Sequence, residues 1–177
     1  SYILDKDFLY SPKSNEKYNS LEILKTISGI AKELKERGIE KGDRVLIYLN
    51  NSPEYLFSLF AIWRIGAIAI PTNRIYTTNE LSYLVEDSDS KLIITDEKAK
   101  DILDSDILPP ANTKWDDLCQ LQYTSGTTGK PKGSMLTHGN YYTAIHNECD
   151  VLGLKQTDIF LGIYPMAHVG LSWAISA

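Results

Sequence analysis

The chain has 177 residues, of which 43% are hydrophobic and 23% charged. This composition is ordinary for a globular domain and excludes a collagenous chain, a disordered chain and a disulfide-stapled scaffold. The formal net charge of −5, without a long basic run, argues against a nucleic-acid partner.

Nothing in the sequence predicts a membrane span or an oxidising compartment. The most apolar stretch, residues 55–71, is interrupted by Arg64 and Gly66, whereas a spanning helix needs about 20 apolar residues. Cys119 and Cys149 are too few for a disulfide scaffold, and we expect two buried thiols in a cytoplasmic protein. The oligomeric state stays open.

The first half of the chain alternates strands and helices. A helix is predicted over 21–37, where apolar residues recur every three or four positions. Asn19 with Glu22 forms a capping box, and Gly38 follows the helix.

Predicted strands at 44–49, 67–71 and 91–95 are separated by helices that begin at Ser52 and Thr77. This order predicts an α/β fold, a layered domain that contains a parallel sheet.

The second half is less regular. Residues 96–117 read as a linker or surface loop, because its acidic residues lack the tight spacing of a metal-binding loop. A strand is predicted at 118–123, a helix from Thr137 or His138 to about Leu152, and a last strand at 159–164.

The segment 124–133 has the composition of a phosphate-binding loop. It contains three glycines, four hydroxyl side chains and two lysines. Glycines let backbone N–H groups turn toward an anion, while hydroxyls and lysine add further donors. The alternative is a hydrophilic hairpin without a ligand. A nucleoside-triphosphatase P-loop is excluded, because Thr124 and Pro131 stand where its first glycine and its metal-binding hydroxyl belong.

Residues 123–133, YTSGTTGKPKG, closely resemble the signature of the adenylate-forming enzymes, which include acyl-CoA synthetases, firefly luciferase and peptide adenylation domains. Three further segments, 18–22, 63–73 and 164–170, are similar to other family elements. The last of them, YPMAHVG, resembles an element typical of acyl-CoA synthetases.

The resemblance implies a two-step ligase that uses ATP, Mg²⁺ and coenzyme A. A carboxylate attacks the α-phosphorus of ATP, and the coenzyme A thiol then displaces AMP from the acyl-adenylate. The residues implied to bind the phosphates are Thr124, Ser125, Gly126, Thr127, Thr128, Gly129 and Lys132. Thr124 is the residue implied to lie nearest Mg²⁺.

His168 is the candidate catalytic residue, because the matching family position lies beside the acyl group. The alternative is a histidine that caps the turn after Pro165. His138 and His146 are expected to be ordinary helix residues. Tyr141, Tyr142 and Trp173 are expected to be packing residues.

Several family features are missing. The adenine, ribose and hinge motifs and the C-terminal lysine would all follow Ala177, and the connection at 97–117 is shorter than expected. We expect residues 1–177 to be the N-terminal part of the large adenylate-forming domain, trimmed at 97–117 and inactive alone. Ala167 replaces a bulky aromatic residue, which leaves the shape of the acyl site open.

The predicted function is activation of a fatty acid of medium or long chain to its acyl-CoA. A different adenylate-forming enzyme, such as an aryl-CoA ligase, a luciferase-like enzyme or a peptide adenylation domain, is one alternative. A non-catalytic nucleotide- or pyrophosphate-binding module and an inert interaction domain are the others.

Overall fold

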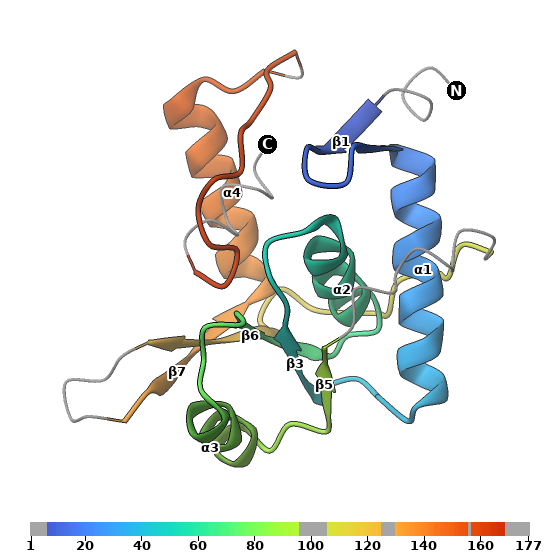
Figure 1. Cartoon of the computed structure of the whole chain (residues 1–177). Helices are drawn as coiled ribbons and strands as arrows, with labels where there is room; N and C mark the ends of the chain where they lie inside the picture. The colour runs from blue at the N-terminus through green and yellow to red at the C-terminus, as the bar shows by residue number, and fades with distance from the viewer. Residues whose placement is uncertain (1–6, 96–105, 125–129, 156, 169–177) are drawn as a thin grey trace.

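The computed structural model describes residues 7–95, 106–124, 130–155 and 157–168. A hairpin of two short strands, which the sequence pattern did not predict, precedes a mixed array of helices and strands (Figure 1). In chain order the elements are β1 (Asp7–Ser11), β2 (Glu16–Asn19), α1 (Ser20–Glu36), β3 (Arg44–Tyr48), α2 (Pro53–Arg64), β4 (Ile68–Thr72), α3 (Thr78–Ser88), β5 (Leu92–Ile94), β6 (Leu118–Thr124), β7 (Lys132–Thr137) and α4 (His138–Leu152).

The main sheet has the strand order β5-β3-β4-β6-β7. Its first four strands are parallel, and β7 runs antiparallel to β6. The predicted α/β fold with a parallel sheet is therefore confirmed. The apolar run in β3 is buried on both faces, as parallel strands covered by helices require.

Helices cover both faces of the sheet. Val45 and Ile47 of β3 belong to the core that contains α1 and α2. Leu46, between them, packs with Ile70 and with Leu84 of α3 in a second core on the other face. Figure 1 shows α3 on one side of the strands and the α1–α2 pair on the other. Successive β3 side chains therefore supply two separate cores.

The predicted helix ends are confirmed. The Glu22 N–H donates to Asn19 Oδ1 at 2.9 Å, and the Asn19 N–H donates to Glu22 Oε2 at 2.8 Å. Gly38, just after α1, has a φ of +80°, a conformation that glycine adopts without strain. Each of these contacts depends on residues within a few positions of one another.

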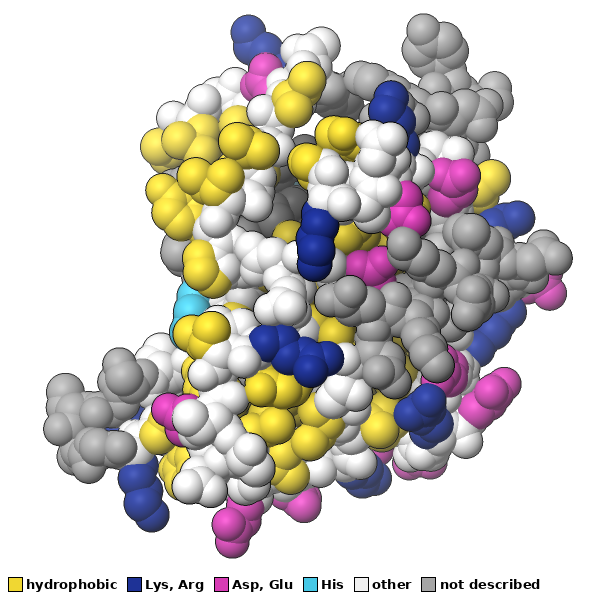
Figure 2. Space-filling view, viewed as in Figure 1, with side chains coloured by type: hydrophobic (Ala, Val, Ile, Leu, Met, Phe, Trp, Pro, Cys, Tyr) yellow, Lys and Arg dark blue, Asp and Glu magenta, His cyan; other side chains and the backbone are white. Residues whose placement is uncertain are grey.

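The predicted strand at 159–164 is wrong. This segment has no regular secondary structure, and Ile159 and Leu161 are 96% and 72% exposed. An apolar run becomes a strand only where a neighbouring strand accepts its backbone hydrogen bonds, and none in the described part of the chain pairs with it. Figure 2 shows hydrophobic side chains gathered around α4 and the segment that follows it.

The two cysteines differ in burial. Cys119 is fully buried, whereas Cys149 is partly exposed, so the expectation of two buried thiols holds for Cys119 alone. Neither cysteine forms a disulfide bond. Among the described residues, no helix is long and apolar enough to cross a membrane.

Candidate functional site

The candidate site lies where the parallel strands end. Because β3, β4 and β6 run in the same direction, their carboxyl ends meet at one edge of the sheet. Asn51 follows β3, Asn73 follows β4 and Thr124 ends β6. Ligands of open parallel α/β sheets bind at this edge. Thr124, a candidate residue from the sequence, therefore lies at the edge of the sheet where a ligand is expected.

Strands β6 and β7 bring the two ends of the predicted phosphate loop together. Thr124 is paired with Lys132, and both side chains are exposed. The predicted phosphate-binding residues between them, Ser125, Gly126, Thr127, Thr128 and Gly129, lie outside the described residues. A hydroxyl group and an ammonium group therefore flank the loop from opposite strands.

The loop is followed by a strand that the sequence pattern does not predict. The strand β7 intervenes, so α4 begins about 20 Å of extended chain beyond Lys132. The N-terminal N–H groups of α4 are therefore too far away to bind a phosphate held by the loop. Strands β6 and β7 pair as a hairpin on either side of the loop.

The two lysines of the loop have different surroundings. The Lys130 ammonium lies 5.7 Å from the centroid of the Tyr83 ring, a distance typical of a cation–π contact. Lys132 is exposed opposite Thr124. Lys132, the lysine chosen from the sequence, is therefore the one paired with the end of β6.

His168 lies in a turn that is hydrogen-bonded to Gln122 of β6 and to Asn51, which follows β3. Its N–H donates to the Pro165 carbonyl at 3.2 Å, which is the turn-capping contact considered for this region. Gln122 of β6 donates from Nε2 to the Ala167 carbonyl at 2.8 Å, and His168 Nδ1 is 3.5 Å from the same nitrogen. The His168 side chain is exposed, and its role at the site stays a prediction.

Asn51 and Gln122 are site residues that the sequence analysis missed. Asn51 donates from Nδ2 to the Tyr164 carbonyl at 2.8 Å and accepts the Met166 N–H on Oδ1 at 2.9 Å. Gln122 also accepts a hydrogen bond from Gln120 at 2.9 Å. Two glutamines on one face of a buried strand were the available signal, since a buried amide needs polar partners.

The other histidines are packing residues, as expected. His138 begins α4 and lies edge-on to Trp63, with ring centroids 6.1 Å apart. Burial lowers the pKa of the His138 imidazole below its usual value. His146 packs on Tyr142, with ring centroids 4.0 Å apart. Tyr141 packs against Trp63, with ring centroids 4.9 Å apart, as predicted.

Thr124 is the described residue predicted to lie nearest Mg²⁺. Thr124 presents an exposed hydroxyl, and hydroxyl oxygen suits a hard cation. Within the described ranges, no group of three histidine, cysteine, aspartate or glutamate side chains could hold a metal ion. The donor set therefore fits an ion held mainly by other oxygens, such as those of a nucleotide phosphate. Trp173, the remaining predicted packing residue, lies outside the described residues.

The fold defines an α/β protein in which Asn51, Asn73 and Thr124 follow or end parallel strands at one edge of the sheet. The family model described as "AMP-binding enzyme" matches residues 4–108 and 95–176. The chain belongs to this family, and the resemblance to adenylate-forming enzymes is confirmed.

Two curated relatives illustrate the family. The chain is 32% identical over 169 residues to a 2-succinylbenzoate–CoA ligase of Geobacillus sp. (strain WCH70), an alignment that covers 86% of this chain and 34% of the relative. It is 30% identical over 204 residues to 4-coumarate–CoA ligase 3 of Arabidopsis thaliana, covering 96% of this chain and 36% of the relative. The chain thus spans about a third of the length of these relatives.

Solved structures give the same fold. Apo MatB from Rhodopseudomonas palustris superposes with a TM-score of 0.88 at 25% identity, covering 97% of this chain and 39% of that one. The o-succinylbenzoate CoA synthetase of Bacillus subtilis, in complex with its acyl-adenylate intermediate, superposes with a TM-score of 0.82 at 28% identity. That match covers 94% of this chain and 48% of the other.

Proposed function

We propose that this chain supplies the phosphate-binding surface and part of the acyl-binding surface of an ATP-dependent acid–CoA ligase. The observation that carries the proposal is the proximity of two elements on β6. Thr124 faces Lys132 on the hairpin, and Gln122, two residues earlier, contacts the turn that holds His168. Both elements belong to segments that match the family.

In the proposed reaction, a carboxylate oxygen attacks the α-phosphorus of ATP and pyrophosphate leaves. Negative charge gathers on the leaving group; the Lys132 ammonium offsets it, and the Thr124 hydroxyl donates a hydrogen bond to it. The loop residues 125–129 add donors on the same side. The coenzyme A thiol then attacks the acyl carbon and displaces AMP.

His168 acts on the acyl side of the same edge. Its exposed imidazole orients the attacking carboxylate, so that the oxygen approaches the phosphorus in line with the leaving group. Mg²⁺, when bound, neutralises phosphate charge, and Thr124 is the described residue that would contribute a ligand to it.

The complete reaction needs residues beyond those of this chain. The chain spans about a third of the relatives' length. We propose that residues 1–177 form the N-terminal part of the large domain, with 97–117 as a shortened connection. The isolated chain should form no acyl-hydroxamate from ATP, an acid and hydroxylamine. Product formation above the protein-free rate would contradict this assignment.

The acid is proposed to be aromatic. The relatives named above are ligases of 2-succinylbenzoate and 4-coumarate, whereas the sequence analysis favoured a fatty acid. A chimera decides between them: this chain replaces the matching third of the Geobacillus ligase, and the acyl-hydroxamate assay compares coumarate with decanoate. A preference for decanoate would support the fatty-acid prediction. The cytoplasmic location stays a prediction, and two cysteines without a disulfide bond are in its favour.

Pyrophosphate binding tests the phosphate site directly. In titration calorimetry with inorganic pyrophosphate, Lys132→Ala should weaken binding by roughly tenfold, because a charge-assisted contact is lost. Thr124→Ala should weaken it less, because a neutral hydroxyl is removed. Lys155→Ala, which removes the same charge far along the chain, is the control and should change little.

The same titration separates the alternatives. Equal affinity in the wild-type chain and in Lys132→Ala would contradict the proposed phosphate site. Tight binding of ATP by the isolated chain would favour a non-catalytic nucleotide-binding module, since the ligase assignment leaves the adenine pocket to residues outside this chain. No binding of either ligand would favour an inert interaction domain.

A further inference from the structure

Helix α3 contacts both strands of the β6–β7 hairpin, called the phosphate hairpin from here on, close to its loop. The Tyr123 hydroxyl, at the end of β6, donates to Asp87 Oδ2 at 2.6 Å. On the other strand, the Tyr83 hydroxyl lies 3.1 Å from the carbonyl of Pro131. Tyr83 and Asp87 are one helical turn apart on α3, and Figure 1 shows this helix beside the hairpin.

The Asp87 carboxylate links the two contacts. Its Oδ1 lies 3.1 Å from the Tyr83 hydroxyl, which therefore shares one proton between Asp87 and Pro131. Burial and the carboxylate raise the pKa of the Tyr123 phenol, so the phenol keeps the proton that it donates. One acidic side chain is thus bonded to the tyrosines that touch the β6 end and the β7 end of the loop.

Two packing contacts reinforce this arrangement. Gly133 is paired with Tyr123, and a Cβ at this position would lie 3.1 Å from the Tyr123 ring. The absence of a side chain at Gly133 therefore lets the Tyr123 ring lie close to β7. The Lys130 ammonium, 5.7 Å from the Tyr83 ring centroid, extends the contact along the loop. Tyr123 itself is 2% exposed.

We propose that Asp87, Tyr83 and Tyr123 are positioning residues that fix the phosphate hairpin on α3. They hold the Thr124 and Lys132 ends of the loop in register before the ligand arrives, so that binding does not have to order them. The expected effect on phosphate binding rests on the proposed function, whereas the contacts between α3 and the hairpin do not depend on that function. None of the three side chains needs to touch the phosphates.

The direction in which removal of the Asp87 charge changes pyrophosphate affinity tests the proposal. Asp87 is negative and lies near a site proposed for an anion. By Coulomb's law alone, removing its charge would strengthen pyrophosphate binding. If the carboxylate positions the hairpin, removing its charge will weaken binding instead. Glu86 is an exposed carboxylate on the same helix, so Glu86→Gln reports the charge effect alone.

The experiment uses the whole chain and the variants Asp87→Asn, Tyr123→Phe and Glu86→Gln. Pyrophosphate affinity should fall about fivefold in the first two variants and stay equal or rise slightly in the third. Amide hydrogen exchange at Thr124 and Lys132, beside the loop, should become faster in the first two. Exchange at Leu118 and Thr137, the far pair of the same hairpin, should not change.

The two readouts separate the two proposals. Without pyrophosphate binding by the wild-type chain, the phosphate site fails, and hydrogen exchange alone decides the positioning role. Unchanged exchange at Thr124 and Lys132 in Asp87→Asn overturns the positioning role. Equal pyrophosphate affinities of the Asp87→Asn and Glu86→Gln variants would also overturn it. A non-additive effect of Asp87→Asn and Tyr123→Phe together would support the direct link between them.

Discussion

Gly139, the second residue of α4, has no room for a side chain. Its N–H donates to the Trp115 carbonyl at 2.8 Å. An added Cβ would lie 2.6 Å from the Trp115 ring and 2.9 Å from the Trp115 carbonyl oxygen. Because that oxygen belongs to the backbone, a rotamer change of Trp115 cannot relieve the overlap. The close approach fixes the start of α4 on the segment before β6.

We therefore expect Gly139→Ala to destabilise the fold by about 1–3 kcal/mol, the usual range for overpacking. Gly162→Ala is the matched control, because the nearest atom to a Cβ there is 3.8 Å away. The free energy of unfolding in urea measures both. Equal stability of the two variants would mean that the α4 start shifts freely, contrary to the close contact described.

At the scale of elements, α3 depends on its N-terminal cap. The Thr77 side chain accepts the Glu80 N–H at 3.3 Å, and the Glu80 carboxylate accepts the Thr77 N–H at 2.7 Å. These bonds satisfy backbone donors that the helix itself cannot pair. The same helix carries Tyr83 and Asp87, so its stability also governs the hairpin contacts.

Thr77→Ala removes the side-chain acceptor, so we expect a loss of about 1 kcal/mol in the free energy of unfolding. Thr77→Ser keeps the hydroxyl and should stay close to the wild-type chain. Urea titration followed by circular dichroism gives both values. A Thr77→Ser loss as large as that of Thr77→Ala would show that the methyl group, rather than the cap, matters.

Elements differ in how well sequence alone predicts them. The helices were predicted within a residue or two, because caps and apolar periodicity are local properties. Strand β7, KGSMLT, was missed, since its residues show no regular alternation and its place as an edge strand comes from pairing with β6. The apolar segment 159–164 shows the opposite error, because its composition suits a strand but it has no strand partner.

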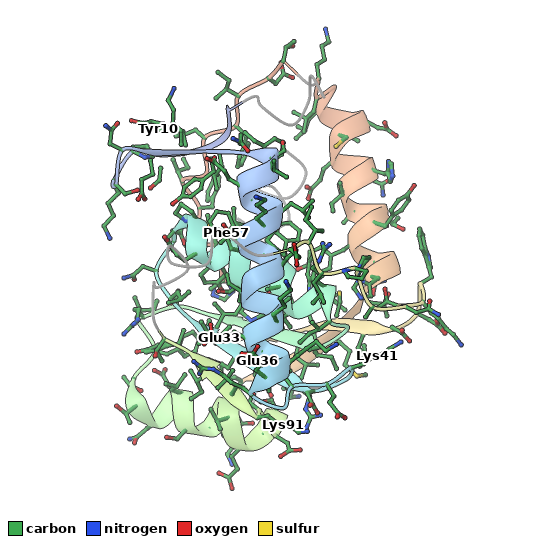
Figure 3. The ribbon with its side chains drawn as sticks, turned by 90° about the vertical axis from the view of Figure 1, so that its right-hand side faces the viewer. Tyr10, Glu33, Glu36, Lys41, Phe57 and Lys91 are labelled. Carbon is green, nitrogen blue, oxygen red and sulfur yellow. The ribbon has the colours of Figure 1, made fainter. Side chains whose placement is uncertain are left out.

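At the scale of the whole molecule, charged residues tie the amino end of the sheet together. The Lys91 ammonium is 2.8 Å from Asp43 Oδ1, which joins the start of β5 to the turn before β3. Figure 3 shows Lys91 and Lys41 at the end of the molecule where α1 finishes. Burial alone would raise the pKa of Asp43, but hydrogen bonds from Lys91 and the Glu40 N–H lower it below its usual value.

This pKa shift predicts a pH dependence of stability. A carboxylate whose pKa is lowered by folding stabilises the folded state above its unfolded pKa of about 3.9, and the effect disappears as the pH falls through the folded pKa. Asp43→Asn should therefore lose about 1 kcal/mol at pH 7, since Lys91 is half exposed and partly screened. The difference from the wild-type chain should shrink below about pH 4.

Urea unfolding at pH 7 and at successively lower pH measures the difference. Asp116→Asn, a change at an exposed aspartate, is the control and should cost little stability at pH 7. A constant deficit for Asp43→Asn across the whole pH range would assign the loss to packing instead of charge.

The sequence by itself determined the α/β alternation, the capped helices and the phosphate-loop motif that marks the family. Each of these depends on residues near one another in the chain. Only the tertiary structure decided that β6 and β7 pair on either side of the loop, that Gln122 reaches Ala167 across 45 residues and that Asp87 reaches Tyr123 across 36. The reason is physical: such contacts depend on the order of strands in the sheet, and local sequence patterns do not encode that order.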